Sequence, residues 1–290
     1  MFKNLTLLTL LFLCSVAIYA QDSTYYAIYN SKGRPVGFAN MIKELADKNI
    51  VLFGELHNDQ SLHELQLNIA KKLNKKKSLV LGAEMLERHD QSLIDEYLQG
   101  IINSSQLFEE ADLWPNFKSD YLPLLDFAKE KKAAFIGTNI PRALAKVAAF
   151  KNIEYLDSIR TDSINSLMCP FPFSLPEKVK PYKELIKSDF GASHGMDTRK
   201  IVTAQALKDA TMAHSILEYY DSERIFLHFN GDFHSKDHGG IAHWLNFYNE
   251  KKLNISVISS VESTNLEFKN EWKKQGDFII VVLETGPKSY

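Results

Sequence analysis

The sequence predicts an α/β fold, in which a mainly parallel β-sheet is flanked by helices and carries a small inserted helical subdomain. Short apolar runs alternate with segments of helical periodicity, and polar residues follow several of these runs where a strand should end. The clearest run is Ile50–Phe53, four apolar residues of the kind found in strands buried on both faces. Regular alternation of strands and helices is typical of βαβ units, and therefore of parallel pairing.

The first twenty residues have the composition of a secretory signal peptide. Lys3 supplies a positive charge, Leu5–Ile18 is almost entirely apolar or uncharged, and Ala20 is a small residue suited to cleavage after it. The apolar stretch is short for a retained membrane anchor. We therefore expect residues 1–20 to be removed and the protein to be exported, into a periplasm or out of the cell.

The cysteines and the net charge argue against a lipoprotein, a disulfide-bonded protein and a nucleic-acid-binding protein. Leu13 stands before Cys14 where a lipoprotein signal needs a small residue, so we expect no lipid anchor. Without the signal peptide, Cys169 is the only cysteine, and no intramolecular disulfide can form. The formal net charge is −2 and no basic patch indicates a nucleic-acid partner. The 290 residues, 45% of them hydrophobic, are enough for a sizeable core.

The α/β domain is predicted to comprise residues 21–149 and 198–290. One long helix is expected at Thr198–Tyr220, where apolar residues recur at helical spacing. The strands are expected at Tyr25–Tyr29, Ile50–Phe53, Ser78–Gly82, Ala133–Ile136, Ile225–Phe229, Ile255–Ile258 and Phe278–Leu283.

Residues 150–197 interrupt this alternation and are predicted to form a helical subdomain or lid. The segment has no convincing strand pattern, and short helices are expected at Ile153–Ser166 and Tyr182–Ser188. Prolines punctuate it at Pro170, Pro172, Pro176 and Pro181.

Polar residues gather where three of the predicted strands end. Two Gly-x-x-His elements, Gly54–His57 and Gly231–His234, follow two of the strands, and Glu84 follows the strand at Ser78–Gly82. Ligands of open parallel sheets bind outside the carboxyl ends of the strands. We therefore expect the three strand ends to converge on one polar site.

The residue types at these strand ends suit two kinds of chemistry. His57 and His234, with Glu55 and Glu84, could hold a divalent metal ion. The same four residues could instead act as catalytic acids and bases with separated pKa values. Alternatively, these four residues have no chemical role and only satisfy the polar groups at the strand ends.

Other histidines and motifs carry less information. Glu64 follows His63 instead of preceding it, so the zinc-binding His-Glu-x-x-His helix is absent. His238 and His243 are expected to be solvated, and His89 has no pattern around it. The nucleophile elbow, the P-loop and the dinucleotide fingerprint are also absent, which leaves serine hydrolase, NTPase and dinucleotide functions without support.

Three more polar residues are candidates for ligand binding. Arg142 opens a predicted helix after a strand, where it could bind a carboxylate or phosphate, or pair with Glu55 or Glu84. Gln205 and Asp209 lie four residues apart on one helical face and either point into the same cleft or lie at the surface.

The proline-rich segment supplies material for a haem pocket, which needs a broad apolar wall and an axial His, Tyr, Cys or Met. Aromatic clusters of this kind are more often ordinary core. The residues concerned are Met168, Phe171, Phe173, Leu175, Tyr182, Phe190, His194 and Met196.

At several motifs the sequence resembles the ChaN-like family of haem-binding proteins, within the wider Tiki, TraB and erythromycin-esterase-like group. The resemblance extends from about Tyr25 to Val257, and the motifs keep their order. They are Leu52–His57, Gly82–Met85 with Gln91, Tyr121–Leu124, Asn139–Arg142, Tyr182–Glu184, His194–Gly195, Ala204–Gln205 with Asp209, Met212–Ala213 and Gly231–His234.

This resemblance implies an exported, non-enzymatic protein that binds haem for haem or iron acquisition, with outer-membrane transport machinery as a partner. In the family, haem can be held cofacially across a homodimer with tyrosine ligation, and Tyr182 and Tyr121 lie in matching motifs. His194, Arg142, Gln205 and Asp209 complete the implied haem-binding residues. The chain departs from the family in lacking a lipoprotein signal and in carrying Gly239 where relatives often have an aromatic residue.

The wider group implies a rival function. It includes metal-dependent proteases that use a glutamate and Gly-x-x-His histidines similar to Glu55, Glu84, His57 and His234. The alternative prediction is therefore a metal-dependent hydrolase in which these residues bind the metal or activate a water molecule.

Overall fold

The computed structural model of the chain describes residues 25–188, 191, 195, 197–250 and 252–290. The predicted signal peptide lies outside the described residues. No helix within the described residues has the length and apolar character needed to cross a bilayer.

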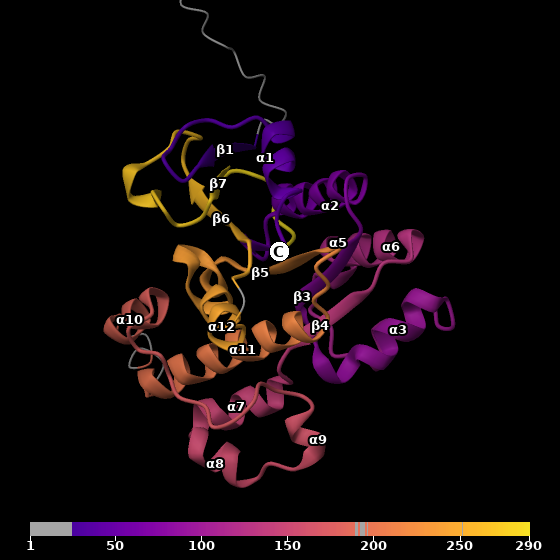
Figure 1. Cartoon of the computed structure of the whole chain (residues 1–290), viewed down its shortest axis with the longest axis vertical. Helices are drawn as coiled ribbons and strands as arrows, with labels where there is room; N and C mark the ends of the chain where they lie inside the picture. The colour runs from indigo at the N-terminus through magenta and orange to yellow at the C-terminus, as the bar shows by residue number, and fades with distance from the viewer. Residues whose placement is uncertain (1–24, 189–190, 192–194, 196, 251) are drawn as a thin grey trace, which may run out of the picture.

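One β-sheet of seven strands runs through the described part of the chain, in the order β1-β7-β6-β2-β5-β3-β4 (Figure 1). Neighbouring strands are parallel except for the edge pair β1 and β7, so the predicted α/β fold is confirmed. The strands are β1 (Tyr26–Asn30), β2 (Ile50–Glu55), β3 (Leu79–Glu87), β4 (Phe135–Asn139), β5 (Ile225–Gly231), β6 (Ile255–Ser263) and β7 (Phe278–Leu283).

Strand β2 lies at the centre of the sheet because both of its faces are apolar. Val51 and Phe53 pack into the core on one face, and Ile50 and Leu52 pack into the core on the other. This alternation follows from the two-residue period of a strand. In the register with β5, Glu55 is paired with Gly231, so the two strands end side by side.

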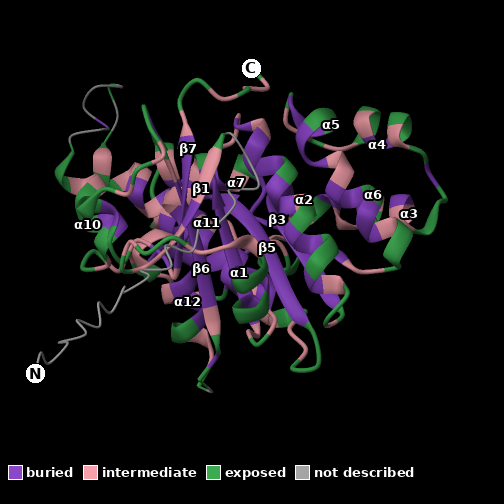
Figure 2. Cartoon of the chain, turned by 90° about the horizontal axis from the view of Figure 1, so that it is seen from above, coloured by how far each residue is buried: buried purple, intermediate pink, exposed green. Residues whose placement is uncertain are grey.

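Helices cover both faces of the sheet, and burial is concentrated in the strands between them (Figure 2). The first core layer includes α1, α2, α3 and α6, and the second includes α7, α11 and α12. The helices are α1 (Phe38–Leu45), α2 (Gln60–Asn74), α3 (Gln91–Gln99), α4 (Ser104–Glu110), α5 (Phe117–Asp120), α6 (Leu122–Lys131), α7 (Arg142–Phe150), α8 (Ile153–Ser158), α9 (Asp162–Asn165), α10 (Lys180–Lys187), α11 (Thr198–Glu218) and α12 (Gly240–Tyr248).

The described residues between 150 and 197 form the helices α8, α9 and α10 and contain no strand. Leu156, Met168 and Cys169 from this segment are buried in the same core layer as α7 and α11. The helical segment is therefore packed onto the sheet domain, and its division into a separate subdomain stays a prediction.

Strand β3 is longer than the sequence pattern indicates. It continues to Glu87, so Glu84 lies within the strand and not after it. The regular pairing with β5 nevertheless stops at Ala83, and the register with β4 shifts between Ala83 and Glu87. Glu84 is thus freed from regular pairing at the point where the sequence predicted a strand end, and its side chain can turn toward β5.

The central strands set the stability of the fold, and a matched pair of substitutions tests this. Ile258→Ala in β6 removes a side chain with no exposed surface, and we expect it to lower the free energy of unfolding by about 2–5 kcal/mol. Ile101→Ala, at a residue that is 65% exposed, should change it by less than about 0.5 kcal/mol. Urea unfolding followed by circular dichroism measures both values, and equal losses would contradict the assignment of the core.

Candidate functional site

The ends of β2, β3 and β5 bring Glu55, His57, Glu84 and His234 into one region. Glu55 and Glu84 stand in strands, His57 follows β2, and His234 lies in the short 3₁₀ turn Asp232–His234 after β5. The parallel register explains this, because the carboxyl ends of these strands share one edge of the sheet.

Glu55 is the centre of the first hydrogen-bond network. Its Oε1 accepts from His57 Nδ1 at 2.9 Å and from the Tyr121 hydroxyl at 2.5 Å, and its Oε2 accepts from Gln66 Nε2. Burial alone would raise the pKa of Glu55, but the hydrogen bond from His57 and the charges of His57 and His63 lower it. Glu55 is therefore a buried carboxylate held in its charged form.

A second layer of polar residues supports this network from α2 and α5. His63 Nδ1 lies 3.1 Å from Gln66 Oε1, and His63 Nε2 lies 3.3 Å from Asp120 Oδ2. Asn116 donates to Asp120 Oδ2 at 2.7 Å and to the backbone carbonyl of His57 at 2.9 Å. These contacts fix the loop that carries His57.

Glu84 and His234 form the second network. Glu84 Oε1 lies 3.2 Å from His234 Nε2, and His234 Nδ1 lies 2.6 Å from Asp209 Oδ1. The other Asp209 oxygen accepts from the Tyr182 hydroxyl at 2.6 Å, and that hydroxyl accepts from Trp244 Nε1 at 3.2 Å. All five side chains are buried.

The charges of this second network determine its protonation. Burial would lower the pKa of His234, but the neighbouring Glu84 and Asp209 carboxylates raise it to about 10. Burial would raise the pKa of Glu84, but the positive charge of His234 lowers it well below its usual value. Near neutral pH the pair is a buried imidazolium beside a carboxylate.

Gly231 lies where the two networks meet. Its backbone N–H donates to Glu84 Oε2 at 2.8 Å, and a Cβ atom at this position would lie 2.7 Å from His57 Nε2. Any side chain would therefore separate His57 from Glu84. Burial would lower the pKa of His57, but its hydrogen bond to Glu55 and the charges of Glu55 and Glu84 raise it.

His57 is the part of the site that solvent can reach. Its side chain is 31% exposed, whereas those of Glu55, Glu84 and His234 are between 0% and 8% exposed. The Trp114 ring packs against the His57 ring in an edge-on contact, with 4.7 Å between the ring centres. Chemistry at this site would therefore have to begin at the His57 imidazole.

The predicted metal-binding set is not arranged around an ion. Glu55 holds His57 Nδ1, and both nitrogens of His234 are engaged by Asp209 and Glu84. Ligand atoms of these four residues are not gathered within reach of one centre, whereas another group of described residues is. The side chains therefore fit an ion-pair network better than a metal site, and the metal-binding role stays a prediction.

The other residues predicted to bind a ligand do not all lie at this site. Arg142 does not contact Glu55 or Glu84: its backbone N–H donates to Glu87 Oε2 at 2.9 Å, because β3 extends to Glu87 beside the start of α7. Asp209 joins the site, whereas Gln205 has a buried Oε1 with no hydrogen-bond partner among the described residues. His194 lies outside the described residues.

Tyr121 and Tyr182, the predicted haem ligands, have buried hydroxyl groups. Tyr121 is 1% exposed and Tyr182 is 0% exposed, and each donates to a carboxylate. Burial and the neighbouring carboxylates raise the pKa of both phenols. As arranged here, neither oxygen is accessible to a haem iron, and their ligand roles stay predictions.

Sequence reasoning missed the polar residues that support Glu55. His63 and Gln66 are three apart on α2, a helix capped by the Asp59 side chain. That spacing on a buried helical face was a detectable signal. Ser289 gave no signal, yet its hydroxyl donates to Asp120 Oδ2 at 2.5 Å from the far end of the sequence.

The buried pair predicts a specific pH dependence of stability. The raised pKa of His234 adds stability that is complete below its usual value of 6.5 and is lost as pH rises through about 10. The lowered pKa of Glu84 adds stability above its usual value of 4.5 that is lost in acid. Urea unfolding should therefore show declining stability between pH 7 and about 10.

Glu84→Gln is the variant that tests this linkage. It removes the charge that raises the pKa of His234, so the alkaline decline should become shallower while stability at neutral pH falls by about 3–5 kcal/mol. His243→Gln, at a half-buried residue outside both networks, is the control and should keep the original slope. An unchanged slope in Glu84→Gln would show that the pair does not titrate as described.

Comparison with solved structures agrees with the fold. The structure titled "Cofacial heme binding to ChaN of Campylobacter jejuni" matches with a TM-score of 0.66 and 19% identity, covering 90% of this chain and 98% of that chain. A succinoglycan biosynthesis protein matches with a TM-score of 0.51 and 11% identity, covering 86% and 91% of the two chains. At these identities the likeness shows the fold alone.

No curated protein sequence matches the chain. The sequence profile of the family described as "Haem-binding uptake, Tiki superfamily, ChaN" matches residues 41–245, well over half of the chain. The match spans the strand ends that carry both polar networks, and it confirms the resemblance seen in the sequence motifs. The chain therefore belongs to the ChaN family of the Tiki superfamily.

Proposed function

We propose that this protein binds haem. The observation that carries the proposal is the family match over residues 41–245, since the family is described by haem binding and uptake. The similar fold of the Campylobacter jejuni protein, whose title names cofacial haem binding, supports it.

The haem is proposed to lie away from the two polar networks. The pocket beside His63 and Asp120 has a volume of only about 150 Å³, and pockets for ligands of drug size measure about 300–1,000 Å³. The networks themselves are filled by hydrogen-bonded side chains. A porphyrin ring needs a broad apolar face, which the described residues around these networks do not offer.

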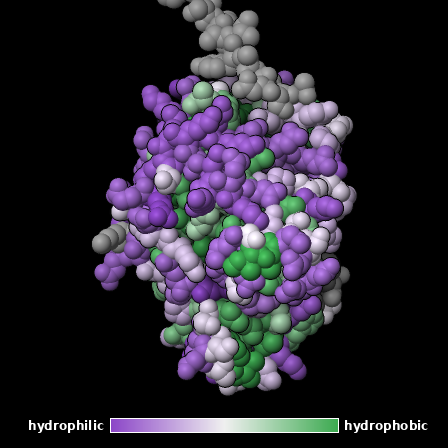
Figure 3. All heavy atoms as spheres, turned by 90° about the vertical axis from the view of Figure 1, so that its right-hand side faces the viewer, coloured by the Kyte–Doolittle hydropathy of each residue, from purple (hydrophilic) through white to green (hydrophobic). Residues whose placement is uncertain are grey.

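The end of α7 and the start of α8 offer such a face. Phe150 is 63% exposed and Tyr155 is 48% exposed, two of the exposed large hydrophobic side chains among the described residues. Figure 3 shows apolar side chains gathered at the end of the molecule where Figure 1 places α8 and α9. Lys146, four residues before Phe150 on α7, and Lys151 are exposed beside it.

These residues suit the iron, the porphyrin ring and the propionates of a haem. We propose that Tyr155 supplies the axial oxygen, that Phe150 packs on the ring, and that Lys146 or Lys151 pairs with a propionate. When bound, haem would supply redox-active iron. Tyr155 replaces the buried Tyr121 and Tyr182 as the leading candidate because it is exposed. His194 stays a candidate for the opposite side of the ring.

A second copy of the chain is the proposed cover for this apolar face. Exposed aromatic surface of this kind is buried most readily against the same surface of another subunit, which would enclose haem between two protomers. Export after cleavage near Ala20, haem or iron acquisition and delivery to outer-membrane transport machinery are proposed on the sequence of residues 1–20 and on the family's description.

A haem titration of residues 21–290 tests the proposal. We expect a saturable Soret shift, with an absorbance band from tyrosinate ligation that Tyr155→Phe removes. Tyr182→Phe should keep the band because its hydroxyl is buried. Tyr219→Phe is the matched control, since Tyr219 is also exposed, at 45%, but lies at the end of α11.

Dimer formation is tested separately. Size-exclusion chromatography with light scattering should show the mass doubling on haem addition. No Soret shift would overturn haem binding. A shift that survives Tyr155→Phe and disappears in Tyr182→Phe would return the ligand role to Tyr182.

Hydrolysis at the strand-end site is the second candidate function. One observation favours it: the partly exposed imidazole of His57 is held by a buried carboxylate, as in a general base oriented by an acid. If the protein hydrolyses activated esters, His57→Asn should lower the rate by about 100-fold or more, and His243→Asn should not. Sensitivity of that rate to chelators would separate the metal-dependent form, and no ester hydrolysis by the unaltered protein would remove this candidate.

A further inference from the structure

A second group of charged side chains lies at the outer part of the same sheet edge. Glu87 is the last residue of β3, and His89 and Asp90 follow it in the 3₁₀ turn Arg88–Asp90. Asp112 comes from the connection between α4 and α5. We call Glu87, His89, Asp90 and Asp112 the β3-end cluster. None of its members takes part in the two networks described above.

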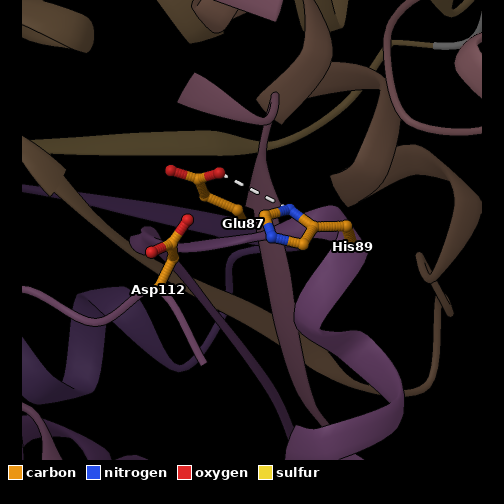
Figure 4. A group of neighbouring side chains, drawn as sticks. All are labelled: Glu87, His89 and Asp112. Carbon is orange, nitrogen blue, oxygen red and sulfur yellow. Dashed lines mark ion pairs between the residues drawn. The ribbon is translucent and has the colours of Figure 1, made fainter. Parts of the chain in front are cut away.

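Three of the four side chains of this cluster converge on one point. Single ligand atoms of Glu87, His89 and Asp112 lie within 4.8 Å of one another, and Figure 4 shows the three side chains turned toward each other. Donor atoms around one transition-metal ion lie about 2.0–2.2 Å from it, and therefore within about 4.4 Å of one another. Small side-chain rotations would bring the three onto one centre.

The contacts within the cluster are loose. His89 Nδ1 lies 3.5 Å from Glu87 Oε2, and His89 Nε2 lies 3.4 Å from Asp90 Oδ1. Strong hydrogen bonds between such groups are about 2.7–3.2 Å long. The cluster therefore differs from the strand-end networks, where most of the corresponding distances are shorter.

Asp90 gives an independent indication that the cluster suits a cation. The residue is only 3% exposed, yet its Oδ2 is buried without a hydrogen-bond partner among the described residues. A buried carboxylate oxygen without a partner is costly and calls for a cation or a donor. The other oxygen of the same carboxylate faces His89, so the unpartnered carboxylate belongs to the cluster.

The positive charge already present does not balance the three carboxylates. Arg142 is the guanidinium paired with the cluster, and its Nε lies 3.7 Å from Glu87 Oε1 with a side chain that is 55% exposed. His89 is the other basic group. Both oxygens of Glu87 face Arg142 or His89, so the carboxylate oxygen that lacks a partner among the described residues is Asp90 Oδ2.

Solvent reaches the cluster directly. Glu87, His89 and Asp112 line a surface pocket of about 350 Å³, whose other walls include Pro141 and Leu144 of the α7 region. A metal site needs an entry path of this kind as well as its ligands.

We propose that the β3-end cluster binds one divalent first-row transition-metal ion. The His89 imidazole and the Glu87 and Asp112 carboxylates form a mixed nitrogen and oxygen set, which suits Mn²⁺, Fe²⁺ or Zn²⁺, and the Asp90 carboxylate adds negative charge beside His89. The bound ion would join the end of β3 to the connection that carries Asp112. Trp114 follows Asp112 by two residues and packs on His57, so the ion would also steady the cover of the strand-end site.

Manganese binding to the full chain tests this proposal without relying on any activity. The protein is first treated with a chelator and dialysed, and Mn²⁺ is then titrated while the electron paramagnetic resonance signal of the free ion is followed. We expect each chain to bind one Mn²⁺ ion tightly. Zn²⁺ should displace it, because Zn²⁺ lies above Mn²⁺ in the usual affinity order. Asp112→Asn and His89→Ala should each weaken binding by at least about tenfold.

Two controls make the outcome decisive. Glu109→Gln changes an exposed acid on α4 outside the cluster and should leave the affinity unchanged. His57→Ala tests whether the ion binds at the strand-end site instead. The proposal is overturned if the unaltered chain binds no Mn²⁺, if Asp112→Asn binds as tightly as the unaltered chain, or if His57→Ala alone abolishes binding. Circular dichroism of each variant checks that the fold is retained.

Discussion

The buried contact between Glu84 and His234 is the constraint on which the rest of the structure depends. Two charged groups removed from water destabilise a protein unless each is fully hydrogen-bonded. Here the requirement is met by three different parts of the chain: the Gly231 amide for Glu84, Asp209 of α11 for His234, and Tyr182 of α10 for Asp209. The positions of β3, β5, α10 and α11 relative to one another are therefore fixed by one chain of polar contacts.

The molecule separates two kinds of surface that could serve function. At the strand ends the side chains are buried, charged and mutually hydrogen-bonded, and only His57 reaches solvent. At the α7–α8 end the aromatic side chains of Phe150 and Tyr155 are exposed, together with Lys146 and Lys151. A rigid polar centre suits proton transfer or structural support, whereas an open apolar face suits a flat ligand.

The sequence was sufficient to predict the fold and the meeting of the three strand ends. Buried parallel strands are continuous apolar runs, and their polar terminators must share one edge, so Glu55, Glu84 and His234 could be placed together. The sequence was not sufficient to show what satisfies them. The partners of Asp209 and Asp120 are chosen by tertiary packing, and the burial of Tyr182 depends on where α10 docks against α11. Glu87 and Asp90 flank His89 in the sequence, but the approach of Asp112 depends on how the connection between α4 and α5 packs.

Strand order has a consequence for how the chain acquires its structure. Strand β2 pairs on one side with β5 and on the other with β6, so residue 50 meets residues 226 and 255. Contacts this distant in sequence close late, and they slow folding. Until β5 has been synthesised, both edges of β2 are open, and the edge that pairs with β6 stays open longer. Open strand edges and uncovered apolar residues favour aggregation during this interval. The Glu55 network draws its side chains mainly from residues 55–121 and can form early, whereas the second network requires the later His234 and Trp244.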